Sequence, residues 1–315
     1  MNGQHLSERV YPGSTGLLVS PLGVGAWAWG DRFIWGYGRD YGESDVHGAF
    51  QASLELGINF FDTAEIYGWG RSERLLGRFI REAGQPVVVA TKFMPFPWRL
   101  RRKSLLNALQ SSLNRLGLSQ IDLYQIHSPL SIISIETWMA GLAEAVGAGL
   151  TRAAGVSNYN VEQTRRAHAA LARRNVPLAS NQVEYSLLHR EPEHNGLMQT
   201  CRDLNITLIA YSPLGMGLLT GKYTPDNPPK GLRGRRTSAK FLANIQPLIG
   251  LLREMGAAHG GKTPPQVALN WVMCKGALPI PGAKNARQAR ENAGALGWRL
   301  SEDEVAALDA ESKDL

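Results

Sequence analysis

The chain has 315 residues, of which 43% are hydrophobic and 19% charged, and its formal net charge is +7 at neutral pH. This composition is that of a globular protein with a large core, which excludes the disordered and fibrous classes. No run of 18 or more apolar residues occurs and no secretory signal is visible, so we expect neither a membrane span nor a membrane partner. Its two cysteines, Cys201 and Cys274, favour a reducing cytoplasm and predict neither a disulfide framework nor a bound metal.

The positive charge is concentrated in two runs, at residues 99–103 and 230–236. Basic runs can bind nucleic acid or anionic small molecules. Neither run is interleaved with the aromatic strand motifs of RNA-binding sheets, so we expect no nucleic-acid partner and interpret both runs as solvated basic surface. Contact between the second run and a phosphate-bearing cofactor remains an open alternative.

Short β-branched and apolar runs recur along the chain, and each is followed by an amphipathic segment. Eight such runs predict strands at residues 22–27, 58–64, 87–93, 121–127, 151–157, 178–185, 206–212 and 277–281. Several are continuously apolar, as parallel strands buried on both faces are. Alternating strands and helices imply an α/β fold, either a doubly wound sheet or a barrel. The number of units favours one (β/α)8 TIM barrel domain over residues 1–315, with a β-hairpin cap formed by residues 10–19.

Helix boundaries carry recognisable signals. A helix is expected to begin at Ser44 and to end before Gly57, and a leucine stripe from Leu105 to Leu116 can be closed by Gly117 in the left-handed conformation. Capping pairs mark three further helix starts, at Asn160 with Gln163, Thr263 with Gln266, and Ser301 with Glu304.

Ionisable residues stand at the ends of three successive predicted strands. Asp62 and Tyr67 end or follow the second strand, Lys92 lies near the end of the third, and His127 ends the fourth. A lone histidine in such a place is usually a hydrogen-bonded core residue, and a lone lysine is usually a surface residue. In a barrel, however, the carboxyl ends of the strands meet at one face, so these four groups would converge on one site.

This set of side chains suits proton-coupled reduction of a carbonyl group. The free pKa of tyrosine, about 10, is too high for an efficient acid at neutral pH. A neighbouring Lys92 cation would favour the phenolate and lower the pKa of Tyr67. Asp62 could hold Lys92 in place, and His127 could hydrogen-bond the substrate oxygen and orient it toward Tyr67.

Asp62, Tyr67, Lys92 and His127 together resemble the catalytic tetrad of the aldo-keto reductase superfamily. The surrounding segments are similar to that family too, in the expected order: GINFFDTAEIYGWGRSERLLG, VVVATKF, LYQIHSP, GVSNYN, NQVEYSLLHR and AYSPLGMGLLTGKY. The branch that it resembles contains potassium-channel β subunits, pyridoxal reductases and bacterial general-stress reductases. The resemblance implies NADP(H) as cofactor and a small carbonyl compound as substrate.

The resemblance also implies which residues hold the cofactor. The strand ends that would surround the nicotinamide contain Gly25, Ala26, Trp27, Asp62, Ser157, Asn158, Gln182 and Tyr211. The loop around the pyrophosphate would contain Ser212, Pro213, Leu214, Gly215, Gly217 and Lys222, with glycines that allow close backbone approach. The adenosine segment would contain Gly282, Lys284, Gln288, Glu291 and Asn292.

Lys284 is the residue that we expect to meet the 2′-phosphate of NADPH. The alternative is that Lys284 is a solvated surface lysine and that Arg233, Arg235 or Arg236 binds this phosphate from the seventh strand's loop.

Aromatic residues after the first and third strands predict the walls of a substrate pocket. Trp29, Trp35, Phe96 and Trp98 are the expected members, and the alternative is that they pack as a loop core. The chain stops at Leu315, soon after the helix that starts at Ser301, so we expect substrate choice to depend on the loops after strands 1, 3, 4 and 7. A redox-sensing regulatory subunit that retains NADPH is the rival function. No additional N-terminal segment is visible, which favours the enzyme.

Overall fold

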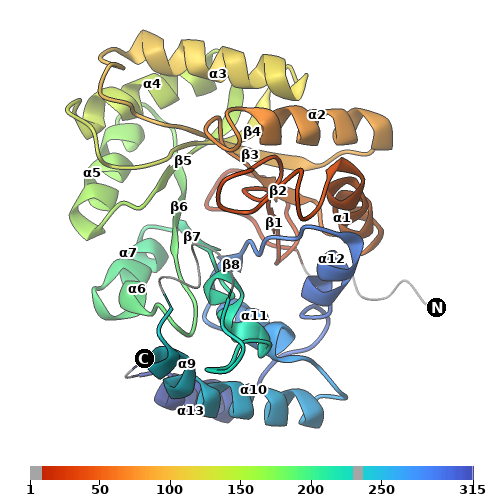
Figure 1. Ribbon diagram of the computed structural model, residues 1–315. Coiled ribbons are helices and arrows are strands. Elements are labelled where there is room, and N and C mark those ends of the chain that lie inside the picture. The colour runs from red at the N-terminus through yellow and green to blue at the C-terminus, as the bar shows by residue number, and fades with distance from the viewer. Residues whose placement is uncertain (1–8, 230–236, 314) are drawn as a thin grey trace.

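The structure, a computed structural model, describes residues 9–229, 237–313 and 315. The basic run at 230–236, with Arg233, Arg235 and Arg236, lies outside the described residues. Eight parallel strands form one sheet in sequential order, and helices surround it (Figure 1). The strands are β1 (Val24–Gly25), β2 (Phe60–Asp62), β3 (Val88–Phe93), β4 (Ile121–Ile126), β5 (Thr151–Ser157), β6 (Leu178–Glu184), β7 (Thr207–Tyr211) and β8 (Leu278–Pro279).

The sheet closes on itself between its first and last strands. The Gly23 N–H donates to Pro279 O at 2.9 Å, and the Gly25 N–H donates to Pro281 O at 3.0 Å. A Cβ at Gly25 would lie 2.8 Å from Ile280 O, so only glycine permits this close approach. The predicted (β/α)8 barrel is therefore confirmed.

Helices follow the strands in the predicted alternation. Their bounds are α1 (Glu43–Glu55), α2 (Arg71–Ala83), α3 (Arg102–Leu116), α4 (Ile135–Gly147), α5 (Val161–Ala172), α6 (Glu191–His194), α7 (Leu197–Asp203), the 3-10 helix η1 (Gly215–Thr220), α9 (Ala239–Asn244), α10 (Gln246–Ala258), α11 (Pro264–Cys274), α12 (Ala286–Ala293) and α13 (Glu302–Glu311). Gly117 ends α3 with a φ of 68°, and the three predicted capping pairs all form. Among the residues described, no helix is long and apolar enough to cross a membrane.

Two hydrophobic cores result from the alternation of side chains along each strand. On β4, Leu123 points into the barrel, whereas Tyr124 and Ile126 pack against the surrounding helices. Leu123 shares the inner core with Phe60 and with small and branched residues of the other strands, which fill the barrel below its carboxyl end. Polar residues at the carboxyl ends of the strands therefore lie directly above an apolar core.

The N-terminal segment packs against the amino ends of the strands. Leu17 and Val19 belong to the inner core, and the Gly13 N–H donates to Thr207 Oγ1 at 3.0 Å. Antiparallel pairing in this segment is limited to one bridge between Val10 and Val19. The expected two-stranded hairpin is therefore not confirmed, since Gly13 of the turn bonds to the barrel instead of across a hairpin.

Candidate active site

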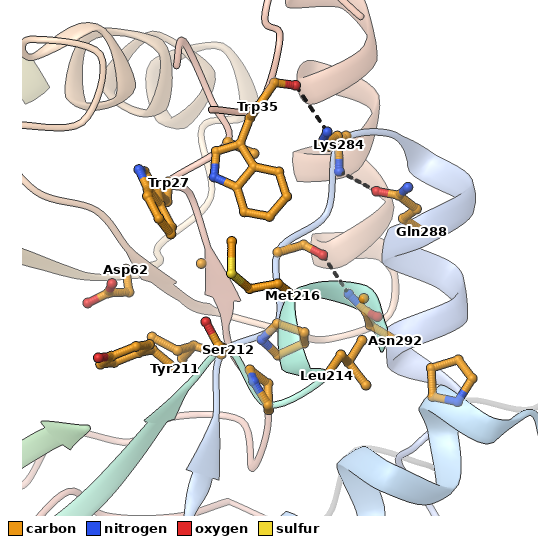
Figure 2. A pocket seen from close by; sticks show the side chains of 18 of the residues that line it. Trp27, Trp35, Asp62, Tyr211, Ser212, Leu214, Met216, Lys284, Gln288 and Asn292 are labelled. Carbon is orange, nitrogen blue, oxygen red and sulfur yellow. Dashed lines mark hydrogen bonds between the residues drawn. The ribbon is translucent and has the colours of Figure 1, made fainter. Parts of the chain in front are cut away.

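A cavity of about 600 Å³ opens at the carboxyl ends of the strands. Side chains from both halves of the barrel line it, together with η1 and the start of α12 (Figure 2). In this view Trp35 lies between Trp27 and Lys284, and Lys284, Gln288 and Asn292 lie on the side formed by the segment after β8. The cavity thus occupies the face where catalytic residues of (β/α)8 barrels are found.

The four residues of the predicted tetrad meet at the bottom of this cavity. Asp62 and Lys92 are fully buried and form an ion pair. The Lys92 Nζ also donates to Thr63 O at 2.9 Å and to the hydroxyl of Tyr67 at 3.4 Å. The ring of His127 stands edge-on to the ring of Tyr67, with centroids 5.7 Å apart. Asp62, Tyr67 and His127 line the cavity, whereas Lys92 lies behind it.

Burial and the Lys92 cation act on Tyr67 in opposite directions. Burial raises the pKa of the Tyr67 hydroxyl, and the charge of Lys92 counteracts part of that rise. Burial alone would lower the pKa of Lys92, but the charge of Asp62 and its hydrogen bond outweigh it, so the pKa is raised and Lys92 stays a cation. The predicted direction of the Lys92 effect is right. The expectation of a net lowered pKa for Tyr67 is wrong for the protein alone, because burial dominates.

His127 is a neutral imidazole at physiological pH. Burial lowers the pKa of His127 to about 3, and the nearby Lys92 cation adds to that shift. Its Nδ1 is buried and has no hydrogen-bond partner among the residues that the structure describes. A neutral imidazole that lines the cavity can donate a ring N–H to a ligand oxygen.

A chain of polar contacts joins the ends of β5, β6 and β7. The Ser157 hydroxyl donates to Gln182 O at 2.8 Å, and the Asn158 amide donates to Ser157 Oγ at 3.1 Å and to His127 O at 3.2 Å. Tyr211 donates its hydroxyl to Asn158 Oδ1 at 3.1 Å, and burial raises the pKa of Tyr211 to about 12. Asn158 has a left-handed φ of 61°, a strained conformation that clusters at functional sites.

The loop after β7 is strained in the same way. Ser212 and Met216 have positive φ values of 50° and 53°, and the neighbouring Gly215 and Gly217 have values of 55° and 95°. Pro213, Leu214, Met216, Gly217 and Lys222 line the cavity with Ser212, whereas Gly215 does not. The loop therefore presents apolar side chains, the Lys222 cation and the backbone of Gly217 to the cavity.

The cation of Lys284 is held at the cavity wall. Its Nζ donates to Trp35 O at 3.2 Å and lies 4.9 Å from the ring centroid of Trp35 and 4.6 Å from that of Tyr41 (Figure 2). The Lys284 N–H donates to Gln288 Oε1 at 2.8 Å, and the Asn292 amide donates to Gly282 O at 3.3 Å. These contacts give Lys284 protein partners that a solvated surface lysine would lack.

Glu291 lines the same end of the cavity as Lys284. One of its carboxylate oxygens accepts a hydrogen bond from the Thr263 hydroxyl at 2.6 Å. Arg287, which the sequence did not single out, is a further cation that lines the cavity, after Lys222 and Lys284, and it lies in the first turn of α12. Its signal was a basic residue immediately before Gln288, within the segment already singled out for the adenosine.

Three of the four residues predicted for the substrate pocket do not line the cavity. Trp29 is fully buried on the outer side of the strands, where its indole N–H donates to Ala283 O at 2.8 Å. Phe96 and Trp98 stack on each other at 4.6 Å, and the Arg99 cation lies over the ring of Phe96. Trp35 does line the cavity, and Trp27 and Ile66 stand with it. Ala26, predicted near the nicotinamide, is buried behind the cavity wall.

Comparison with known proteins agrees with this geometry. The model of the aldo/keto reductase family matches residues 21–313. The chain is 44% identical to a chloroplastic pyridoxal reductase of Arabidopsis thaliana over 311 residues, which cover 95% of this chain and 84% of the relative. The chain therefore belongs to the aldo/keto reductase family and is an NAD(P)-dependent oxidoreductase.

Solved structures of the family have the same fold. A glycerol dehydrogenase from Gluconobacter oxydans is similar with a TM-score of 0.84 and 28% identity, covering 96% of this chain and 94% of that one. An aldo/keto reductase from Klebsiella pneumoniae, solved with NADP and acetate, is similar with a TM-score of 0.76 and 27% identity, covering 96% and 95% of the two chains.

Proposed function

We propose that the protein reduces aldehydes and ketones to alcohols with NADPH, and that Tyr67 donates the proton. The observation that carries this proposal is the Tyr67 hydroxyl, which lies 3.4 Å from the buried Lys92 ammonium and faces the cavity beside a neutral His127. Bound NADPH would supply the hydride that reaches the carbonyl carbon. The carbonyl oxygen takes the proton of Tyr67, which balances the reaction as alcohol plus NADP⁺.

Each member of the tetrad has a role that its surroundings support. Burial keeps Tyr67 protonated and ready to donate, because it raises the pKa of the hydroxyl. Lys92 stabilises the phenolate that remains once the proton has left, since an adjacent cation favours the charged form. Asp62 holds Lys92 by their buried ion pair, and neutral His127 hydrogen-bonds the substrate oxygen so that it faces Tyr67.

The cavity lining fits a nicotinamide dinucleotide. Ser157, Asn158 and Gln182 offer amide and hydroxyl groups for the carboxamide, and Tyr211 offers a ring for stacking. The loop from Ser212 to Gly217, with Lys222, would hold the pyrophosphate, and a Cβ at Gly282 would meet only Gly25 O, at 3.7 Å, which leaves room for a ligand. Lys284, Gln288 and Asn292 would hold the adenosine and its 2′-phosphate, and Glu291 would face the adenine amine.

Small aromatic aldehydes are the substrate class that we propose, with pyridoxal among them. Trp27 and Trp35 contact each other edge-to-face at 5.5 Å, and Trp27 stacks beside Tyr67 at 6.1 Å, so an aromatic wall adjoins the acid. Such a wall suits a flat ring that carries its carbonyl toward Tyr67. The name of the Arabidopsis relative supports the same class. We expect the reaction to run in a reducing cytoplasm, where both free thiols are stable.

The test is NADPH oxidation by the purified protein with pyridoxal, benzaldehydes, aliphatic aldehydes and ketones. We expect repeated turnover, fastest with small aromatic aldehydes, and no turnover in Tyr67→Phe. Tight NADPH retention without turnover on any carbonyl would instead favour the redox-sensing regulatory subunit. A strict requirement for one large ketone would contradict the proposed substrate class.

A further inference from the structure

A buried amide lies directly beneath the tetrad. Gln125 is the fifth residue of β4, fully buried, and its partners in the sheet register are Lys92 on β3 and Gly155 on β5. Two residues before it, Leu123 belongs to the apolar inner core. A polar side chain at the boundary of that core is costly unless its hydrogen bonds are made, so its partners reveal what it does there.

Gln125 contacts the carboxylate that holds Lys92. Its Nε2 donates to Asp62 Oδ2 at 3.2 Å, and Gln182 Nε2 donates to the same oxygen at 2.8 Å. The other oxygen, Oδ1, takes the Lys92 ammonium. Asp62 is thus fixed on both of its oxygens, and the amide donors determine the direction in which Oδ1 faces.

The barrel makes room for Gln125 at Gly155. A Cβ at Gly155 would lie 2.9 Å from Gln125 Cγ and 2.5 Å from Ser180 Oγ, both closer than real Cβ contacts. The Ser180 hydroxyl donates to Gln125 Oε1 at 3.4 Å, which orients the amide so that its N–H faces Asp62. Three strands therefore cooperate to place this one donor.

We propose that Gln125 is a positioning residue for the proton donor: by holding Asp62, it keeps Lys92 aimed at Tyr67. This inference rests on the proposed function. The charged and titratable groups that face Tyr67 are Asp62 from β2, Lys92 from β3, His127 after β4 and Tyr211 at the end of β7. Of these, the ion pair of Asp62 with Lys92 is the part that Gln125 touches.

Removing the amide acts on Tyr67 in one direction. Without the Gln125 N–H, the negative charge of Asp62 is less compensated, and Asp62 Oδ2 is held by the Gln182 amide alone, so the carboxylate is held less firmly toward Lys92. Both effects disfavour the phenolate and raise the pKa of Tyr67 further. A weaker acid transfers its proton more slowly, so the chemical step is slowed while the cavity that binds substrate and cofactor is unchanged.

The experiment compares Gln125→Leu with Ser53→Ala, a change at a fully buried hydroxyl that donates to Ala49 O within α1 and does not line the cavity. In Gln125→Leu we expect kcat for reduction to fall roughly tenfold, the loss of one hydrogen bond to a charged group. The limb of the pH profile that reports Tyr67 should move up by about one unit, with KM and the NADPH dissociation constant nearly constant. Ser53→Ala should behave as wild type. An unchanged profile in Gln125→Leu, or an equal loss in both variants, overturns the proposal.

Two further measurements test the proposal if Gln125→Leu does not fold or if the wild type reduces no carbonyl. Should Gln125→Leu not fold, Gly155→Ala displaces the amide without removing it and should move the same limb in the same direction. Should the wild type reduce no carbonyl, tyrosine ring-carbon NMR reads Tyr67 directly, with Tyr67→Phe assigning its signal. A Tyr67 signal that is identical in wild type and in the variant at every pH overturns the positioning role, whatever reaction the protein catalyses.

Discussion

The ammonium of Lys284 donates to the backbone oxygen of Trp35 at 3.2 Å and lies over the Trp35 and Tyr41 rings. This contact joins the segment after β8 to the loop after β1, so the cation is held at the cavity wall before any anion arrives (Figure 2). A preplaced cation gives more affinity to an anion than a mobile one, because less side-chain freedom is lost on binding.

Lys284→Ala should weaken NADPH binding far more than NADH binding. The two cofactors differ by the 2′-phosphate, whose charge of about −2 calls for a nearby cation. A partly shielded, charge-assisted hydrogen bond contributes on the order of 1–3 kcal/mol, or roughly 5- to 150-fold in the dissociation constant. Fluorescence titration with both cofactors measures this difference.

Arg290→Ala is the matched control for Lys284→Ala. Arg290 is an exposed cation on α12 that pairs with Glu55 at 3.4 Å and does not line the cavity. It should leave both dissociation constants nearly unchanged. Equal weakening of NADPH and NADH in Lys284→Ala, or no change in either, contradicts the assignment. If only Arg287→Ala weakens NADPH binding selectively, Arg287 and not Lys284 binds the 2′-phosphate.

Tyr67→Phe should abolish carbonyl reduction while NADPH affinity stays nearly constant. The hydroxyl is the proposed proton donor, and general acid catalysis contributes roughly 10²–10⁴-fold. Tyr124→Phe is the control, because the Tyr124 hydroxyl is also buried and has no hydrogen-bond partner among the described residues. Steady-state rates for both variants, with NADPH titrations, make the comparison. A Tyr67→Phe enzyme with most of the wild-type rate would remove Tyr67 from the acid role.

Most of the tetrad could be predicted because each member stands at a strand end. The register of a parallel barrel brings such ends together, so Asp62, Lys92 and His127 needed only correct strand boundaries. Capping pairs were equally readable, since they are local in sequence. The direction of Gln125 could also be predicted. Side chains alternate between the two faces of a strand, so Gln125, two residues before His127, points to the same inward side of β4.

The aromatic loop residues could not be placed in this way. Trp29, Phe96 and Trp98 lie in loops without periodicity, so no pattern in the sequence predicts the direction of their side chains. Trp29 turned outward because its indole finds Ala283 O, and Phe96 pairs with Trp98 beside Arg99, which Glu65 holds by an ion pair. Those partners are distant in sequence or depend on one loop geometry, so they cannot be predicted from composition or residue spacing.

Lys92→Met should slow reduction and raise the pKa that the pH profile assigns to Tyr67. The Lys92 charge is the main influence that lowers the pKa of the buried hydroxyl, so its removal leaves burial and Asp62 to raise it. The descending limb of reduction at alkaline pH, and the ascending limb of alcohol oxidation, should both move to higher pH. An unmoved profile would exclude Lys92 from this role.

Stability and chemistry can be separated at this pair of residues. Lys92→Met leaves Asp62 buried without its cation, which typically destabilises a protein by about 3–5 kcal/mol. The double variant Asp62→Asn, Lys92→Met removes the uncompensated charge and should recover much of the thermal stability without recovering the rate. Recovery of both together would mean that Lys92 acts only through folding.

Glu193→Gln should destabilise the fold at neutral pH and much less in acid. Glu193 on α6 accepts hydrogen bonds from Arg190 and Lys275, at 2.8 Å each, and from Tyr185 at 2.9 Å, in a cluster that Asp309 of α13 completes. Burial alone would raise the pKa of Glu193, but these hydrogen bonds outweigh it and lower the pKa to about 2. The folded pKa of Glu193 lies below its unfolded pKa, so the stability from this carboxylate is present above about pH 4.5 and is lost as the pH falls toward 2.

Urea unfolding of Glu193→Gln should show a loss of unfolding free energy on the order of 2–3 kcal/mol at neutral pH, and this loss should shrink near pH 3. The exposed neighbour Glu191→Gln should change little at either pH, and an equal loss for Glu193→Gln at both pH values would contradict the argument.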